Sequence, residues 1–330
     1  MLSNSEIFNI QTHKQFDKIA LQIFRFQYQN NAVYHNFCTL LKINVSQVKT
    51  IKQIPFLPIQ FFKSHKVVSN IDEAEQVFTS SGTTGTSTSQ HFVTDVSVYK
   101  QSYLQGFSMF YGDIQDYVVL ALLPSYQQRT GSSLIYMVDD LIQKTNNLES
   151  GYFLENHYDL LQRINKLQTE NKNIILIGVT FALLDLLETI KKSDSNFDGS
   201  NLIVIETGGM KGRRREIIRE ELHQILQNDF GVSSIHSEYG MTELLSQAYS
   251  LGDGVFECPP WMQISIRDTE DAQTYVNIGR TGGINVIDLA NINSCSFIAT
   301  QDLGKLHQNG TFEVLGRFDN SDIRGCNLMV

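Results

Sequence analysis

The sequence predicts an α/β protein with a mostly parallel sheet covered by helices on both faces, followed by a β-rich region. Between residues 76 and 231, continuous apolar segments alternate with amphipathic segments of ten or more residues. This pattern is typical of parallel strands joined by crossover helices. After about residue 254, short segments separated by turn residues take over, which favours antiparallel pairing.

Length and composition are typical of a soluble globular protein with one large domain or two ordinary ones. The chain has 330 residues, of which 42% are hydrophobic and 18% charged, and its net charge is −9. Because non-specific nucleic-acid binding requires a basic surface, this charge argues against nucleic acid as a partner. The longest apolar run, residues 174–187, is interrupted by Thr180 and Asp185 and is too short to span a membrane.

The N-terminus and the cysteines predict a cytoplasmic protein with free thiols. Residues 1–18 carry polar groups throughout and lack the apolar core of a secretory signal. The cysteines are widely scattered and form no CxxC pair, which argues against a disulfide scaffold and a structural zinc site. They are Cys38, Cys258, Cys295 and Cys326.

The predicted elements follow in chain order. Residues 14–42 have apolar spacing compatible with helices, and residues 54–67 are too aromatic for a solvated linker, so we expect extended chain packed on the body. Apolar segments predict strands at 76–81, 117–124, 173–180 and 201–209. Amphipathic segments predict helices at 94–110, 132–145, 181–190 and 213–231, the last ending at Gly231.

The β-rich region contains four further strand candidates, at residues 263–268, 282–289, 295–300 and 311–318. The change of pattern suggests an α/β core over residues 1–253 and a β-rich subdomain over 254–330 that ends in a short tail.

The segment FTSSGTTGTSTS, residues 78–89, is rich in hydroxyl groups and glycine but has no lysine. A Walker A loop requires a lysine that reaches the outer phosphates, so that interpretation is weak. Glycines allow successive N–H groups to point at one anion, and the hydroxyls add donors. By itself the segment is compatible with either a phosphate-binding loop or a flexible surface loop.

A second motif, HSEYGMTELLSQ at residues 236–247, places Tyr239, Thr242 and Glu243 around a glycine turn. An aromatic ring, a hydroxyl and a carboxylate suit a base, a phosphate and Mg²⁺ respectively. The alternative is purely structural: Thr242 as the N-cap of a helix that carries Glu243.

Two more segments add to this pattern. The glycines of ETGGMKG, residues 206–212, follow a strand, where α/β folds bind ligands. GRFDNSDIRGCN, residues 316–327, is dense in charge and follows the turn TQDLG.

In this order and at this spacing, the motifs resemble those of the adenylate-forming superfamily of acyl- and aryl-CoA ligases. TSSGTTG resembles its phosphate loop, YGMTE its tyrosine–threonine–glutamate motif, TQDLG its ribose-binding aspartate and GRFDNSD its hinge. More closely, the segments IPFLPIQFFKSHKV, PSYQQRTGSSLIYM, CPPWM and RGCNLM resemble the LuxE-type acyl-protein synthetases. The resemblance extends from about residue 50 to the end of the chain.

The resemblance implies the fold of the large domain of adenylate-forming enzymes, with ATP and Mg²⁺ as cofactors. It implies that the β- and γ-phosphates are held by Ser80, Ser81, Gly82, Thr83, Thr84 and Gly85. The adenine would be lined by Gly208, Gly209, Tyr239 and Gly240. Thr242 would contact the α-phosphate, Glu243 would hold Mg²⁺, Asp302 would bind the ribose, and Arg317 would lie near the ribose or a phosphate.

The sequence departs from the superfamily pattern because the usual small C-terminal domain, with its catalytic lysine, is missing. LuxE-type proteins are likewise short, so this departure agrees with the resemblance to them. Candidates for the missing cation are Lys63, His65, Lys211 and Lys305. Glu238 stands where many members have a smaller polar residue.

The LuxE-type reaction implies that Cys326 receives the acyl group from acyl-AMP. Arg324 lies two residues away, and a nearby guanidinium favours the nucleophilic thiolate. A mobile tail would let one thiol visit two active sites. The alternative is a buried cysteine that packs as a small apolar side chain.

The predicted function is therefore ATP-dependent activation of a carboxylic acid, expected to be fatty, and transfer of the acyl group to a cysteine thiol. A reductase or acyltransferase would be the partner. The alternatives are an acyl- or aryl-CoA ligase and an inactive nucleotide- or acyl-binding subunit. Arg129 is a candidate for the substrate carboxylate or for a structural ion pair. A metal site at Cys258 and Cys295, with His236 or His307, is a weak further alternative because their spacing is arbitrary.

Overall fold

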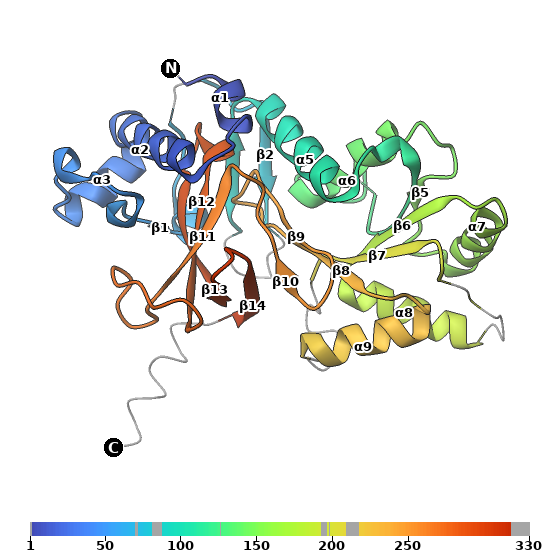
Figure 1. Cartoon of the computed structure of the whole chain (residues 1–330). Helices are drawn as coiled ribbons and strands as arrows, with labels where there is room; N and C mark the ends of the chain where they lie inside the picture. Colours follow the sequence, from blue (N-terminus) through green and yellow to red (C-terminus); the bar gives the residue numbers. More distant parts are fainter. Residues whose placement is uncertain are drawn as a thin grey trace. The chain divides into compact units, whose positions relative to one another are not determined.

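The structure is a computed structural model that describes residues 2–69, 72–80, 88–125, 127–192, 197, 199–208 and 218–317. The chain divides into two compact units (Figure 1). The first consists of Met1–Tyr103, Gly240–Gln247 and Glu257–Val330, and the second of Leu104–Tyr239 and Ala248–Phe256. This division differs from the expected boundary at residue 253, because the β-rich region groups with the N-terminal part of the chain.

The first unit combines short helices with antiparallel strands. Its N-terminal elements are α1 (Asn4–Phe8), α2 (His13–Asn30), α3 (Ala32–Leu40), η1 (Val45–Gln47), η2 (Ile51–Gln53), β1 (Leu57–Pro58), α4 (Phe61–Ser64), β2 (Gln76–Thr79), β3 (Gln90–Val93) and the start of α5 (Val96–Tyr111). Its C-terminal elements are β11 (Met262–Arg267), β12 (Thr281–Asp288), η4 (Leu289–Asn291), β13 (Phe297–Leu306) and β14 (Phe312–Arg317).

The main sheet of this unit runs in the order β14-β13-β12-β11, with every neighbour antiparallel. This confirms the antiparallel pairing predicted for the β-rich region. Strand β1 joins the sheet parallel to β13, with Leu57 beside Ile298, so part of the predicted extended segment 54–67 is a strand of this sheet.

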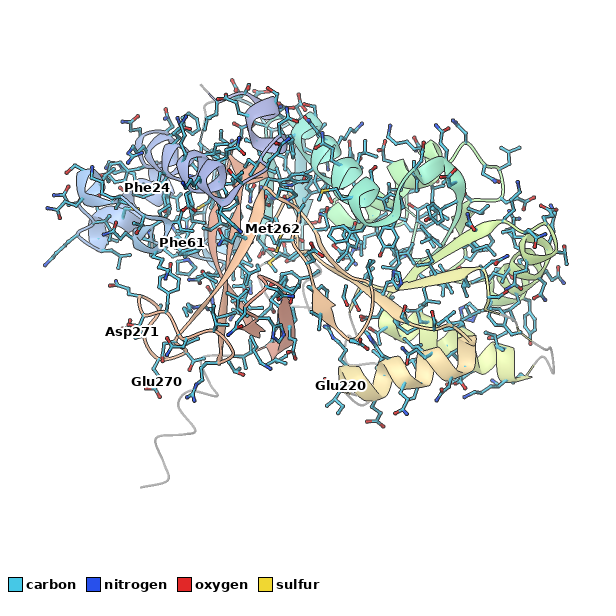
Figure 2. All side chains as sticks on the ribbon, viewed as in Figure 1. Phe24, Phe61, Glu220, Met262, Glu270 and Asp271 are labelled. Atoms are coloured by element: carbon cyan, nitrogen blue, oxygen red, sulfur yellow. The ribbon has the colours of Figure 1, made fainter. Side chains whose placement is uncertain are left out.

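Helix α2 packs on the sheet through its apolar face. Phe24, labelled in Figure 2, is fully buried, and its ring meets the ring of Phe297 edge-on at 6.3 Å between centroids. In contrast to Phe24, Glu270 and Asp271 in the loop between β11 and β12 are exposed to solvent (Figure 2). The acidic side chains of this loop thus face solvent, whereas aromatic side chains such as Phe24 and Phe297 lie in the core.

The second unit contains the parallel sheet. Its elements are the rest of α5, η3 (Ile114–Asp116), β4 (Tyr117–Leu122), α6 (Ser133–Lys144), β5 (Gly151–Tyr152), α7 (His157–Thr169), β6 (Asn173–Gly178), α8 (Thr180–Lys192), β7 (Leu202–Glu206), α9 (Arg219–Phe230), β8 (Ile235–Tyr239), β9 (Ala248–Ser250) and β10 (Val255–Phe256).

The strands of this sheet are ordered β5-β4-β6-β7-β8-β9, and only the last pair, β8 and β9, is antiparallel. Helix α6 lies on one face, and α8 and α9 lie on the other (Figure 1). Val119, Ile175 and Ile205 line a small apolar cavity together with Met137 and Leu141 of α6. The prediction of buried parallel strands covered on both faces is confirmed.

Local capping explains where several helices begin and end. The Ser132 hydroxyl accepts a hydrogen bond from the Ile135 N–H, so α6 begins at the predicted serine pair. Helix α9 ends at Gly231, whose φ of 65° is the left-handed conformation that glycine adopts at low cost. The predicted start of this helix at 213 lies outside the described residues. Among the helices that the structure describes, none is long and apolar enough to cross a membrane.

Candidate active site

The Ser/Thr/Gly segment connects β2 and β3, which pair as an antiparallel hairpin with Thr79 opposite Gln90. Just beyond the strands, the Ser80 N–H donates to the Ser89 carbonyl at 3.1 Å, and the Ser89 N–H donates to the Ser80 hydroxyl at 2.9 Å. These two hydrogen bonds extend the pairing of β2 and β3 by one residue pair and hold the two ends of the segment together as a stem. Ser81, Gly82, Thr83, Thr84 and Gly85 lie outside the described residues.

The Tyr–Gly–Met–Thr–Glu motif forms a turn rather than the start of a helix. The Leu244 N–H donates to the Met241 carbonyl at 3.1 Å, and the chain then continues to strand β9. A helix does not follow because the N–H groups of Leu245 and Ser246 donate to the carboxylate of Asp288, at 2.7 and 3.0 Å. The helix-like continuation and the N-cap alternative for Thr242 are therefore wrong.

Glu243 lies almost fully buried beside the stem of the loop, at 5% exposure. Burial raises the pKa of its carboxyl group, and a hydrogen bond with the Ser89 side chain acts in the opposite direction. The charge of Arg317 also lowers the pKa of Glu243, and the charge of Asp302 raises it. Both groups are thus close enough to Glu243 to interact with it.

Asp302 and Arg317 are cross-strand neighbours on β13 and β14. The Arg317 Nε atom lies 3.1 Å from Asp302 Oδ1, and the Arg317 side chain is 74% exposed whereas that of Asp302 is 11% exposed. A register shift at Leu303 and Gly304 follows immediately. A nearly buried carboxylate is therefore paired with a largely exposed guanidinium.

Gly208 and Tyr239 belong to the second unit, where they follow or end the adjacent parallel strands β7 and β8. Gly208 has a φ of 76°, and its N–H donates to Glu206 Oε1 at 2.7 Å. The Tyr239 ring is 8% exposed and packs edge-on against Phe256 at 6.0 Å. Gly209 lies outside the described residues, and Gly240 opens the turn in the first unit.

Glu238 and Glu206 form a pair of neighbouring acids at the ends of the same two strands. Burial, and then the charge of Glu206, raise the pKa of Glu238 to about 8. Glu206 also accepts a hydrogen bond from the Thr180 hydroxyl at 2.6 Å. Glu238 is therefore mostly uncharged near pH 7, a property that its position in the motif did not reveal.

Two of the candidates for the missing cation, Lys305 and His65, have other partners in the structure. Lys305 Nζ lies 3.3 Å from Glu313 Oε1, and the His65 ring stacks on Phe61 at 5.2 Å. Lys63 is exposed on α4, and Lys211 and Cys326 lie outside the described residues. No group of three or more metal-binding side chains occurs in the described part of the chain, so the cysteine–histidine metal site is not found there.

Sequence reasoning missed several polar side chains around the Thr242–Glu243 turn, namely Ser89, His91, Asp288 and Asn291. Each is at most 2% exposed. The only local signal is the alternation of Ser89, just before β3, with His91 and Val93 on that strand, which places the three side chains on one buried face.

Comparison with known proteins identifies the family. The model of the acyl-protein synthetase family LuxE matches residues 4–330. The chain belongs to this family. Two relatives named long-chain-fatty-acid–luciferin-component ligase, from Aliivibrio fischeri and Vibrio harveyi, are each 24% identical to it. The matches cover 94% and 97% of this chain and 86% and 88% of those proteins.

Solved structures agree on the fold. An open conformation of 2-hydroxyisobutyryl-CoA ligase, in complex with 2-HIB-AMP and CoA, gives a TM-score of 0.70 at 13% identity. That match covers 94% of this chain and 77% of the ligase. ATP-bound MatB from Rhodopseudomonas palustris gives 0.54 at 17% identity, over 76% of this chain and 50% of MatB.

These findings confirm the predicted family and the fold of an adenylate-forming enzyme. The LuxE-family chain is an acyl-protein synthetase that uses ATP to activate a carboxylic acid as acyl-AMP and transfers the acyl group to a protein cysteine.

Proposed function

We propose that this LuxE-family enzyme activates a long-chain fatty acid at a site built around Glu243 and carries the acyl group on Cys326. The observation that supports this most directly is the grouping of Glu243, Asp302 and Arg317 beside the stem of the Ser/Thr/Gly loop. The substrate class follows from the relatives from Aliivibrio fischeri and Vibrio harveyi, whose names specify a long-chain fatty acid.

The nucleotide would be bound by groups of complementary chemistry. Ser80 opens the loop, and Ser81, Gly82, Thr83, Thr84 and Gly85 would direct N–H and hydroxyl donors at the β- and γ-phosphates. Asp302 would accept hydrogen bonds from the ribose hydroxyls. The exposed guanidinium of Arg317 would reach the ribose or a phosphate, and Thr242 would donate to the α-phosphate. Gly208, Gly209, Tyr239 and Gly240 would enclose the adenine.

Glu243 fits the role of a Mg²⁺ ligand. Its burial disfavours the charged carboxylate, so a cation that arrives with the nucleotide would restore the charge. Mg²⁺ commonly takes one or two protein carboxylates and completes its shell with phosphate oxygens and water. When bound, it neutralises the charge that develops as pyrophosphate leaves.

The reaction has two displacement steps. A carboxylate oxygen of the acid attacks the α-phosphorus, the bond to the bridging oxygen of the β-phosphate breaks, and pyrophosphate leaves. The Cys326 thiolate then attacks the acyl carbonyl, AMP leaves, and the thiol proton passes to solvent. The resulting thioester would be delivered to a partner reductase or acyltransferase.

Carboxylate-dependent ATP–pyrophosphate exchange tests the first step. Exchange that increases with fatty acids of increasing chain length, and that is weak with benzoate, supports the proposal. A following assay measures acyl transfer with and without coenzyme A. Acyl-CoA as the main product would replace the proposal with a CoA ligase, and no exchange with any acid would indicate a binding subunit.

A further inference from the structure

Strand β3 and the residue just before it direct two side chains at the Thr242–Glu243 turn. Ser89, which precedes the strand, and His91 are two residues apart, so they lie on the same face of the extended chain, and they are 2% and 0% exposed. The Ser89 hydroxyl hydrogen-bonds with the Glu243 carboxyl group, and His91 Nδ1 lies 2.8 Å from the Thr242 carbonyl oxygen. Gln90, between them, is exposed.

The protonation of His91 follows from these contacts. Burial lowers the pKa of His91 to about 4, so the ring is neutral at pH 7. A carbonyl oxygen can only accept a hydrogen bond, so the single ring proton must be on Nδ1. His91 is therefore a fixed donor to the Thr242 carbonyl.

Asn291, at the end of η4, holds the next carbonyl. Its Nδ2 atom donates to the Glu243 carbonyl oxygen at 2.7 Å, and its side chain is fully buried. Asp288, immediately before η4, accepts the N–H groups of Leu245 and Ser246. The peptide groups of this turn are thus held by side chains from distant parts of the sequence.

The two carbonyl bonds have a specific geometric consequence. A peptide group is planar, so a hydrogen bond to its oxygen fixes the whole plane. His91 holds the plane that precedes the Glu243 Cα atom, and Asn291 holds the plane that follows it. With both planes fixed, the direction of the Glu243 Cα–Cβ bond is fixed as well.

We propose that His91 and Asn291 are positioning residues for adenylation, which orient the Glu243 carboxylate toward the nucleotide-bound metal ion. The inference rests on the proposed role of Glu243 as the Mg²⁺ ligand. His91 also lies opposite Phe78 in the hairpin that carries the phosphate loop. It therefore ties the stem of that loop and the Glu243 turn into one rigid arrangement.

The test compares variants of the full-length enzyme by ATP–pyrophosphate exchange at varied Mg²⁺ concentrations. His91→Leu removes the donor at similar volume, and His91→Asn restores a donor near the Nδ1 position. We expect His91→Leu to lower exchange about 10–100-fold and to raise the half-saturating Mg²⁺ concentration, as loss of an outer partner of a metal ligand does. His91→Asn should recover most of both effects.

A matched control separates positioning from stability. Asn31→Leu removes other buried side-chain bonds in the same unit: Asn31 Nδ2 donates to the Ser294 carbonyl at 3.0 Å and to Ser69 Oγ at 3.4 Å, and Asn31 Oδ1 accepts from the Tyr34 N–H at 3.0 Å. We expect Asn31→Leu to lower the melting temperature as His91→Leu does, without changing the Mg²⁺ dependence. If both variants behave alike in the Mg²⁺ titration, His91 is a purely structural residue and the inference fails.

Two further measurements distinguish failure of the inference from failure of the proposed function. Amide hydrogen exchange of residues 240–247, without any ligand, should accelerate in His91→Leu and Asn291→Leu; an unchanged rate contradicts the positioning role. Glu243→Gln serves as the reference for the metal role. If Glu243→Gln leaves the Mg²⁺ dependence unchanged, the proposed metal ligand itself is wrong.

In the double variant, His91→Leu should add little to the effect of Glu243→Gln, because His91 acts through that side chain. Fully additive losses would contradict this.

Discussion

The carboxyl groups of Glu243 and Asp302 lie in the same unit but in different electrostatic surroundings. Glu243 is kept from its charged form chiefly by burial, whereas Asp302 has the guanidinium of Arg317 at 3.1 Å. A buried carboxyl group gains most from a metal cation that arrives with the substrate. A carboxylate already paired with a guanidinium is better suited to accept hydrogen bonds from sugar hydroxyls. The two acids are therefore assigned different tasks on physical grounds.

Gly208 permits a sharp prediction at the residue scale. At Gly208 and at Gly106 in α5, an added Cβ would meet no described atom within 4 Å, but only Gly208 has a positive φ, of 76°. Gly208→Ala should therefore lower the free energy of unfolding by about 1 kcal/mol, and Gly106→Ala should raise it by about 0.5–1 kcal/mol. Urea denaturation measures both. Effects of the same sign would contradict the assigned backbone conformation.

At the scale of elements, the sequence predicted the strands that are apolar throughout and missed two short strands that carry buried polar groups. Residues 117–124, 173–180 and 201–209 contain β4, β6 and β7, because a strand buried on both faces is a continuous apolar run. Strands β3 (QHFV) and β8 (IHSEY) are short and carry buried polar groups, so they show little periodicity. Their polar side chains bond to partners distant in the sequence, as His91 Nδ1 does with the Thr242 carbonyl oxygen, and the local sequence cannot reveal these partners.

The turn at 241–247 illustrates the same limit. Its local sequence favours a helix, but Asp288 accepts two of its N–H groups from 42 and 43 residues away. The sequence motifs could therefore propose a candidate site, whereas the side chains of His91, Asn291 and Asp288 that support the turn could not be predicted from the sequence.

The buried histidine of β3 predicts an acid-dependent loss of stability. Its ring faces Thr242, Asn291 and Phe62, and the pKa of His91 falls from 6.5 to about 4 on folding. The unfolded chain binds this proton more readily, so the contribution to stability is complete above about pH 6.5 and is lost as the pH falls toward 4.

His91→Asn should remove this part of the acid sensitivity. Between pH 7 and pH 4.5, the free energy of unfolding of the wild type should fall by about 2–3 kcal/mol more than that of the variant. Denaturant titrations at the two pH values measure the difference. Parallel losses in the two proteins would show that His91 is protonated in the folded state.

The segment between β2 and β3, which we propose to bind phosphate, carries its own prediction. Replacing both Thr83 and Thr84 by alanine removes two hydroxyl donors from the proposed phosphate grip, so pyrophosphate exchange should fall at least about 100-fold. The circular dichroism spectrum and melting temperature should be unchanged. Replacement of Thr39 and Thr50 by alanine in the first unit is a matched control. Wild-type exchange in the loop variant would make the segment an ordinary surface loop.

At the scale of the whole molecule, the change of sequence pattern near residue 254 does not coincide with the division of the chain into two units. The β-rich region resembles a separate subdomain because its strands are short and antiparallel. It nevertheless groups with residues 1–103, because β1 pairs with β13 and the Gln27 side chain donates to the carbonyls of Asn291 and Ile292. Contacts between segments more than 200 residues apart produce this grouping, and such contacts cannot be predicted from a single sequence.

At the scale of the whole molecule, we expect one chain to activate the acid and then to hold the acyl group. Cys326 lies outside the described residues, so chemistry in solution must test its role. Cys38 and Cys295 are fully buried, and burial raises the pKa of the Cys38 thiol to about 12 and raises the pKa of the Cys295 thiol as well. Burial likewise raises the pKa of Cys258. These thiols are poor nucleophiles, which supports the proposed role of Cys326 as the acyl acceptor.

The most direct test is therefore to incubate the enzyme with labelled long-chain fatty acid and MgATP, without coenzyme A, and to map the acyl group by mass spectrometry. We expect one hydroxylamine-labile acyl group on Cys326 of the wild type and no such acyl group in the Cys326→Ser variant. Both proteins should catalyse pyrophosphate exchange. Undiminished, hydroxylamine-labile acylation of Cys326→Ser would contradict the proposed role of Cys326.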